Sequence, residues 1–147
     1  MKRFRFPLNG LARLREQQVH QQERRLGTAL ARLKSAEAIR DRIIAQLELK
    51  VQSTPMDAEW SVADRIALDE EQEQLRRALA QAALQVREEN RNVLEERERL
   101  HAVEKDREIL DRLREQKQEE YLRDLMRHEQ QEMDDHIIQT RGEDENA

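Results

Sequence analysis

The stretch QSTPMDAEWSVAD, residues 52–64, decides the fold of this 147-residue chain. Pro, Ser, Thr and Trp occur together only here, and the sequence on both sides is dominated by Glu, Arg, Gln, Leu and Ala, which favour helices. The whole chain contains three Gly and two Pro, so it offers few other places to turn. We therefore predict two long helices joined by a turn at about residues 53–61.

Capping residues mark the start of the second helix. Ser61 is followed three residues later by Asp64, a spacing that resembles the capping box found at helix N-termini. Thr54, which precedes Pro55, can cap one short helical turn inside the connection. These signals predict that the second helix begins at about residue 62.

The composition favours helices that bury only a narrow stripe. Charged residues make up 40% of the chain and aromatic residues 3%, so most positions could not enter a core without stranding a charge. A disordered chain has a similar composition, but here the apolar residues are spaced regularly rather than scattered. The expected fold class is all-α, a long antiparallel two-helix coiled-coil hairpin with unequal arms, forming one domain over residues 1–147.

Two apolar rows predict the first helix at about residues 8–52. Pro7 can precede its first turn, where a missing backbone N–H does no harm. One row follows a seven-residue register broken only by Arg40, and a second row lies three or four positions away. Such rows form the seam of an amphipathic helix that packs against a partner helix. From Leu8 onward, the first row comprises Ala12, Val19, Leu26, Leu33 and Leu47, and the second Ala29, Ala36 and Ile43.

The second helix is predicted at about residues 62–140, followed by an acidic, flexible tail at 141–147. Its apolar residues keep the same three–four alternation, and no Gly or Pro interrupts it before Gly142. These residues are Leu68, Leu75, Leu79, Ala82, Val86, Val93, Leu100, Val103 and Leu110.

The position of the turn also predicts the register of the hairpin. Folding there pairs residues whose numbers sum to about 114. Leu11 is therefore expected near Val103 and Leu26 near Val86, while residues 107–140 extend past the start of the first helix.

The same register locates a polar stretch in the seam of the second helix. Polar residues at a seam cost stability but fix the register, so this stretch either sets the alignment or forms an adaptable, poorly packed middle. The residues are Glu89, Asn90, Glu96 and Arg97, expected opposite Arg24, Arg25, Gln17 and Gln18.

The two parts of the chain carry opposite net charge. Residues 1–50 hold 12 Lys and Arg against 5 Asp and Glu, a net charge of +7, whereas residues 51–147 hold 15 against 27, a net charge of −12. This complementarity favours an antiparallel hairpin within a monomer over a parallel pair of identical helices. The basic residues are spread along a helix among acids, with no recognition fold, so we expect no nucleic-acid binding.

The chain lacks the residue patterns of common catalytic sites. It has no Cys, which removes disulfide and thiolate chemistry and agrees with a reducing cytoplasm, and it has no Gly-rich phosphate loop. Its acidic residues lie along solvated helix faces rather than around a cleft, so nothing positions a substrate. We therefore expect no enzyme activity and no cofactor.

Two further patterns have an ordinary structural explanation. His128, Glu132 and His136 share one helix face, where neighbouring pairs could chelate a divalent metal, but we expect a solvated face and no metal site. The uncharged stretch at 78–86 is far shorter than the roughly 20 apolar residues that a membrane span needs, so no transmembrane segment is predicted. Its small residues either pack inside the hairpin or contact a second partner.

Segments near both ends of the chain resemble one known family. FRFPLNGLARLRE, residues 4–16, resembles the opening of the flagellar export protein FliJ family, an alternating Phe and basic segment followed by a Leu-Arg-Glu run. EYLRDLMRHEQQEMDD, residues 120–135, resembles the family's Tyr-containing segment and the Glu-Gln-Lys-x-Leu-Asp-Glu run after it, with departures at Gln131, Met133 and Asp135. The length, unequal arms and mid-chain turn match as well, so the resemblance covers essentially the whole chain.

The resemblance implies a cytoplasmic component of the flagellar type III export apparatus, peripheral at the inner face of the cell membrane. Members of the family look like the central stalk of rotary ATPases. They insert the coiled-coil end that bears both termini into the ring of the flagellum-specific ATPase, and they contact the export gate protein in the membrane. They have also been described as chaperone-like escorts, so an export chaperone is an alternative function, as is a generic coiled-coil scaffold.

The two phenylalanines near the start are predicted to form part of the ATPase contact. Phe4 and Phe6 alternate with basic residues and precede a proline, so they are expected in extended geometry with both rings on one side. The predicted register places them beside Ile109, Leu110 and Leu113, where they either close the seam or engage the ring. The predicted ATPase contact comprises Phe4, Phe6, Leu8, Leu11, Tyr121, Leu122 and Leu125.

By family resemblance, the second helix also carries an export-gate contact near the turn. It comprises Leu75, Ala78, Leu79 and Ala82. Substitutions at Ala78 and Ala82 are expected to disturb the seam least.

Overall fold

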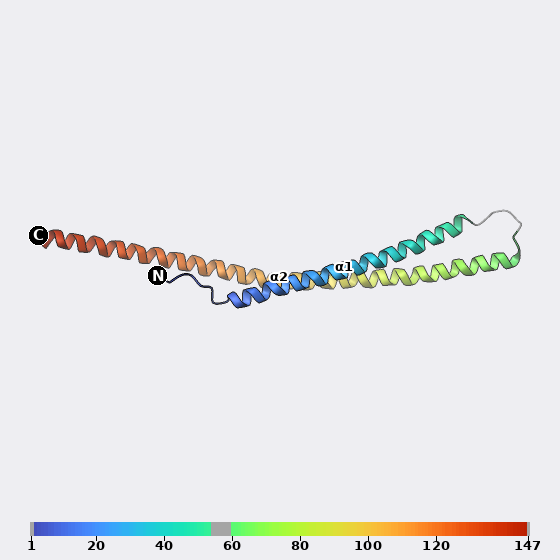
Figure 1. Cartoon of the computed structure of the whole chain (residues 1–147), viewed down its shortest axis with the longest axis horizontal. Coiled ribbons are helices and arrows are strands. Elements are labelled where there is room, and N and C mark those ends of the chain that lie inside the picture. The colour runs from blue at the N-terminus through green and yellow to red at the C-terminus, as the bar shows by residue number, and fades with distance from the viewer. Residues whose placement is uncertain (1, 54–59, 147) are drawn as a thin grey trace. The chain divides into compact units, whose positions relative to one another are not determined.

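The computed structural model describes residues 2–53 and 60–146 and is all-α. Helix α1, Asn9–Gln52, has 44 residues, and helix α2, Val62–Asn146, has 85. The two helices pack as a hairpin with unequal arms (Figure 1), which confirms the predicted fold class. The predicted cap at Thr54 and Pro55 lies outside the described residues.

Contacts group the chain into two units. The central unit is His20–Ala102, and the terminal unit combines Met1–Val19 with Val103–Ala147. Each unit therefore pairs one part of α1 with one part of α2.

The N-terminus of α2 has the predicted capping residues. The backbone N–H of Asp64 donates to the Ser61 hydroxyl oxygen at 3.2 Å, and that hydroxyl donates to the Asp64 carboxylate at 2.7 Å. The first helical hydrogen bond runs from the N–H of Arg65 to the Ser61 carbonyl at 3.2 Å. Ser61 thus satisfies donors that the first helical turn leaves without an intrahelical partner.

Helix α1 begins just after Pro7. The N–H of Asn9 donates to the Phe6 carbonyl at 3.2 Å, and the N–H of Ala12 donates to the Leu8 carbonyl at 2.9 Å. Pro7 has no N–H to offer and its φ suits the start of a helix, so the chain passes from an extended segment into α1 at this point.

Helix α2 continues to Asn146, through residues 141–146 that the sequence assigns to a flexible tail. A glycine ends a helix most readily when it adopts a positive φ, and Gly142 does not. Within a helix glycine costs only about 1 kcal/mol relative to alanine, so Gly142 alone does not stop α2.

The least exposed residues of α1 follow the predicted three–four alternation. Val19, Ala29 and Ala36 are buried on the predicted rows, and Leu26, Leu33, Ile43 and Leu47 are half-buried. Small side chains dominate this narrow core, because it must fit between two helices and nothing else covers it. The buried apolar residues of the described chain are Phe6, Val19, Ala29, Ala36, Ala82, Val86, Val93 and Leu110.

Three polar residues of α1 interrupt the second row and reach acidic residues of α2. In the central unit, the Gln22 side chain donates to the backbone carbonyl of Glu96 at 3.3 Å and to its carboxylate. In the same unit, the Lys50 ammonium pairs with the Glu71 carboxylate. In the terminal unit, the Arg15 guanidinium lies 3.6 Å from the Asp106 carboxylate.

These pairs show that the predicted register is wrong by one to two helical turns. The residue numbers of Gln22 and Glu96 sum to 118, and those of Lys50 and Glu71 sum to 121, instead of about 114. Leu26 therefore lies level with residues 92–95 rather than with Val86. The reason is that the first turns of α2 extend beyond the level at which α1 ends, so the middle of the turn is not the midpoint of the pairing.

The terminal unit has the same shifted register. The residue numbers of Arg15 and Asp106 sum to 121, so Leu11 lies level with about residue 110 rather than with Val103. By the same register α2 extends past the start of α1 from about residue 112, instead of from residue 107 as predicted.

Candidate interaction sites

An extended N-terminal segment packs on α2 in the terminal unit. Residues 2–6 precede α1 and run alongside α2 (Figure 1). The rings of Phe4 and Tyr121 lie 5.5 Å apart between centroids, at an interplanar angle of 44°. The Tyr121 hydroxyl donates to the backbone carbonyl of Lys2 at 2.9 Å. Two members of the predicted ATPase contact, far apart in sequence, are therefore neighbours.

Burial alternates along this segment as the sequence predicts. Phe6 is buried and Phe4 half-buried, whereas Arg3 and Arg5 are exposed. Extended backbone sends successive side chains to opposite sides, so one side of the segment is apolar and the other basic. The apolar side faces the protein.

The place where Phe4 docks differs from the prediction. Phe4 contacts Tyr121, eight residues beyond Leu113, the last of the predicted neighbours. An extended chain advances about 3.3 Å per residue and a helix about 1.5 Å, so each residue of the segment passes about two residues of α2. The register shift adds to this effect.

A few contacts supply most of the free energy that holds the N-terminal segment on α2. Full burial of a phenylalanine contributes roughly 1.5–3 kcal/mol, which makes Phe6 the main anchor. An aromatic pair adds about 0.5–1.5 kcal/mol, and a hydrogen bond a similar amount. Phe4 and Lys2 thus form a weaker outer attachment than Phe6.

The other members of the predicted ATPase contact remain accessible to a partner. Leu8, Leu11 and Leu122 are exposed, and Leu125 is half-buried. The terminal unit therefore presents further accessible apolar side chains from both helices. Their contact with an ATPase stays a prediction.

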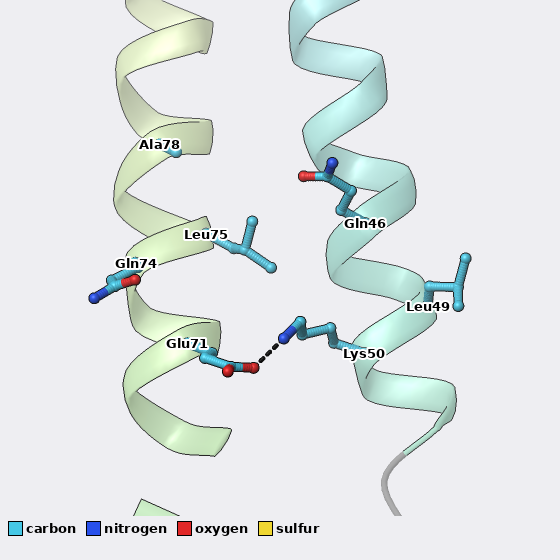
Figure 2. Close-up of a pocket in the computed structure, with 7 residues that line it drawn as sticks. All are labelled: Gln46, Leu49, Lys50, Glu71, Gln74, Leu75 and Ala78. Carbon is cyan, nitrogen blue, oxygen red and sulfur yellow. Dashed lines mark hydrogen bonds and ion pairs between the residues drawn. The ribbon is translucent and has the colours of Figure 1, made fainter. Parts of the chain in front are cut away.

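A second candidate site is an open groove between α1 and α2 in the central unit (Figure 2). The ion pair between Lys50 and Glu71 crosses the groove from one helix to the other. Figure 2 shows Leu75 reaching toward α1, whereas Leu49 points away from the space between the helices and is exposed. The lining residues are Gln46, Leu49, Lys50, Glu71, Gln74, Leu75 and Ala78.

Some residues of the predicted gate contact line this groove, and others lie in the seam between the helices. Leu75 and Ala78 line the groove, while Leu79 is half-buried. Ala82 is 8% exposed, so the expectation that its substitution would disturb the seam least is wrong. Ala82 falls on the three–four alternation that the shifted register keeps inside the helix pair. Binding of a gate protein here stays a prediction.

The polar stretch in the seam of α2 has features of both predicted roles, a register-setting pair and a poorly packed middle. Glu96 is half-buried and accepts from the buried Gln22, as a register-setting pair would. Its partner is Gln22 rather than the predicted Gln17 or Gln18 because of the register shift. Asn90 and Arg97 are exposed and lie outside the seam.

Glu89 is the loosely packed member of this stretch. One of its carboxylate oxygens accepts from the Gln85 side chain at 3.0 Å. The other is buried without a hydrogen-bond partner among the residues that the structure describes. It borders a groove that also contains Arg25, Arg32 and Arg99, whose positive charges offset part of the cost of burying a carboxylate.

Sequence reasoning missed the polar residues of the α1 seam. Arg15, Gln22 and Lys50 fall on the same seven-residue spacing as Ala29, Ala36 and Ile43. Extending that row in both directions would have located all three. Each of them would then have called for an acidic neighbour on α2.

The histidine-containing face of α2 holds a local contact between His128 and Glu132. The His128 Nδ1 lies 3.3 Å from a Glu132 carboxylate oxygen, and both side chains are exposed. Within residues 2–53 and 60–146, no three His, Cys, Asp or Glu side chains are grouped so that they could hold a metal ion. In the same part of the chain, no helix is long and apolar enough to cross a bilayer.

The fold and the two sites define a class of protein. Two paired helices that present apolar side chains and an open groove offer surfaces for other proteins, so this is a helical interaction protein. The chain belongs to the Flagellar FliJ protein family, whose model matches residues 4–143. No curated protein and no solved structure matches the chain. Family membership confirms the resemblance and implies a component of the flagellar export apparatus.

Proposed function

We propose that this protein is a non-enzymatic stalk and coupling factor of the flagellar type III export apparatus. It inserts the end that bears the N-terminal segment and the distal part of α2 into the ring of the flagellum-specific ATPase. It also contacts the export gate, and it works in the cytoplasm at the inner face of the cell membrane. Family membership supports the apparatus, and the terminal unit supports the choice of end.

The observation that carries the proposal is the docking of Phe4 on Tyr121. This contact joins the two segments that carry the family resemblance, residues 4–16 and 120–135, into one surface. Exposed Leu8, Leu11 and Leu122 in the same unit add apolar area that a ring could cover. Basic Arg3 and Arg5 lie on the outer side of the segment, where they can meet acidic residues of a partner.

A second surface is available for the export gate. Leu75 and Ala78 lie in the open groove, well separated in sequence from the residues assigned to the ring. A protein that couples an ATPase to a gate needs two such surfaces. We therefore assign ring binding to the terminal unit and gate binding to the groove of the central unit.

The proposal is tested by adding the purified chain to the flagellum-specific ATPase and recording hydrolysis rate and ring assembly together. A coupling factor raises both, and Phe4→Ala reduces the effect with little change in helix content. Ile138→Ala, a change at an exposed apolar residue of α2, serves as control and leaves stimulation intact. Binding to small export chaperones with no effect on the ATPase would instead identify an export chaperone.

Gate binding has its own test. Ala78→Glu places a charge in the groove and is expected to weaken binding to the cytoplasmic part of the gate protein without changing helicity. Ala80→Glu, an exposed position two residues away, is the matched control. Equal binding by the Ala78→Glu variant would remove the groove from consideration.

A further inference from the structure

The distal part of α2 carries an exposed apolar stripe that shares Leu122 with the proposed ring contact, so a partner on the stripe and the ring compete for this part of α2. Leu122, Met126, Met133 and Ile137 are 49%, 69%, 66% and 47% exposed. At about 100° per residue they fall within an arc of about 60° on the helix surface. All four lie beyond about residue 112, where α2 has passed the start of α1.

This stripe has the properties of a helix-packing surface. Long helices in proteins owe most of their stability to packing of an apolar face rather than to intrinsic propensity. Four large side chains on one face, two of them adaptable methionines, form such a face over about four turns. Ile138 is also exposed but lies about 130° from the middle of the stripe, so it does not belong to it.

The spacing of the stripe is the same in both directions. Its intervals are four, seven and four residues, symmetric about the midpoint between Glu129 and Gln130. An antiparallel pair related by a two-fold axis at that midpoint brings Leu122 to Ile137 of the second copy and Met126 to its Met133. We propose that two copies of this chain associate through the stripe in this antiparallel arrangement, because a two-fold interface must be self-complementary.

Charges on one flank of the stripe fit the same arrangement. Arg123 falls opposite Asp134 of the second copy, and Arg141 opposite Glu119 of the second copy. Within its own chain Arg123 lies 3.9 Å from Glu119, a loose ion pair that leaves the guanidinium able to reach a second carboxylate. Each pair occurs twice in the dimer, which favours the antiparallel alignment over a parallel one.

The other flank holds one unfavourable contact. Glu129 lies beside the two-fold axis and therefore meets Glu129 of the second copy. The whole distal segment is acidic, so the two copies also repel each other at long range. With only four apolar side chains per copy, the interface is at the small end of specific interfaces, and we expect a dissociation constant on the order of 100 μM.

Sedimentation equilibrium of the full chain over a wide concentration range tests the dimer. The wild-type protein shifts from monomer to dimer as concentration rises, and Met133→Glu raises the dissociation constant by more than about tenfold. Ile138→Glu adds the same charge on another face of the same helix, five residues further along, and leaves the constant within about twofold. A wild-type chain that stays monomeric throughout, or equal effects of the two variants, overturns the proposal.

Glu129→Gln separates self-association from binding of a basic partner. Removal of the like-charge contact strengthens the dimer by several-fold, whereas it would weaken binding of a positively charged helix to the stripe. Circular dichroism checks that helix content is unchanged. A weaker dimer in the Glu129→Gln variant contradicts the proposed axis.

Disulfide trapping tests the direction of the pair, since the natural chain has no Cys. A mixture of Met126→Cys and Met133→Cys chains is expected to cross-link faster than either variant alone, and Gln130→Cys to cross-link with itself. Ile138→Cys controls for random collision. Faster self-cross-linking of Met126→Cys than of the mixture would show a parallel pair and refute the arrangement.

Discussion

The central and terminal units hold their helices together in different ways. The central unit relies on a long seam of small side chains, such as Ala29, Ala82 and Val86, with polar links at intervals. The terminal unit has only a few turns of α1 and adds an extended segment fastened by Phe6 and Phe4. The difference teaches that stability is distributed along one unit and concentrated in very few residues of the other.

The largest effect is expected from a charge in the seam of the central unit. Val86→Asp places a carboxylate at a position that is 6% exposed and should lower the free energy of unfolding by more than about 3 kcal/mol. Leu84→Asp, at an exposed site on the same helix, should change it by less than about 0.5 kcal/mol. Urea unfolding followed by circular dichroism measures both. Similar losses for the two variants would mean that the seam is not the main source of stability.

Phe6→Ala should have the next largest effect, and a local one. Removal of a buried phenylalanine costs about 3 kcal/mol. Because Phe6 holds the N-terminal segment and the first turn of α1, this loss lowers the free energy of opening that region rather than that of unfolding the whole hairpin. Hydrogen exchange should therefore speed up at residues 9–14 while the central unit keeps its protection. Phe4→Ala, at a half-buried ring, should give a smaller change in the same amides. Loss of protection throughout the chain would contradict a locally fastened segment.

Substitutions at Gln22 and Glu96 test what the polar contacts between α1 and α2 contribute. Gln22→Leu alone leaves the half-buried Glu96 without its cross-helix donor and should cost about 1–2 kcal/mol. Adding Glu96→Leu should restore stability to near the natural value or above it, because an apolar pair replaces a buried polar one. Spin-label distances between the helices would then report whether the register drifts. A double variant as unstable as the single one would show that the link is required for stability and not only for alignment.

The smallest effect is expected at the exposed link near the turn. Lys50→Ala removes the ion pair with Glu71, whose partners are both substantially exposed, and should cost less than about 1 kcal/mol. The difference from the natural chain should shrink further as salt screens the charges. Thermal unfolding at low and high ionic strength measures this. A loss of stability as large as that of Gln22→Leu would mean that the difference in solvent exposure between the two contacts does not determine how much each contributes.

Features that depend on local sequence were predicted correctly. The spacing of Ser61 and Asp64 predicted the cap of α2, and the seven-residue spacing around Val19 and Ala29 predicted which side of α1 is buried. The alternation of Phe and Arg before Pro7 predicted that both rings lie on one side of the segment and the basic side chains on the other. In each case neighbouring residues determine the outcome through backbone geometry.

Features that depend on alignment between distant segments were not predicted. The register was wrong because the first turns of α2 pass the end of α1, which no local signal reveals. That error carried Phe4 to the wrong neighbours. The polar residues at 15, 22 and 50 did contain the missing information, because each needs an acidic neighbour at its own level of α2.

The single Trp and the single Tyr of the chain give each unit its own optical signal. Trp60 lies against the first turns of α2 in the central unit, and Tyr121 packs on Phe4 in the terminal unit. Fluorescence of the indole and absorbance of the phenol therefore follow two different regions of an unlabelled protein in one denaturant titration. Coincident curves would mark a single cooperative transition, whereas an earlier tyrosine signal would show the terminal unit opening first.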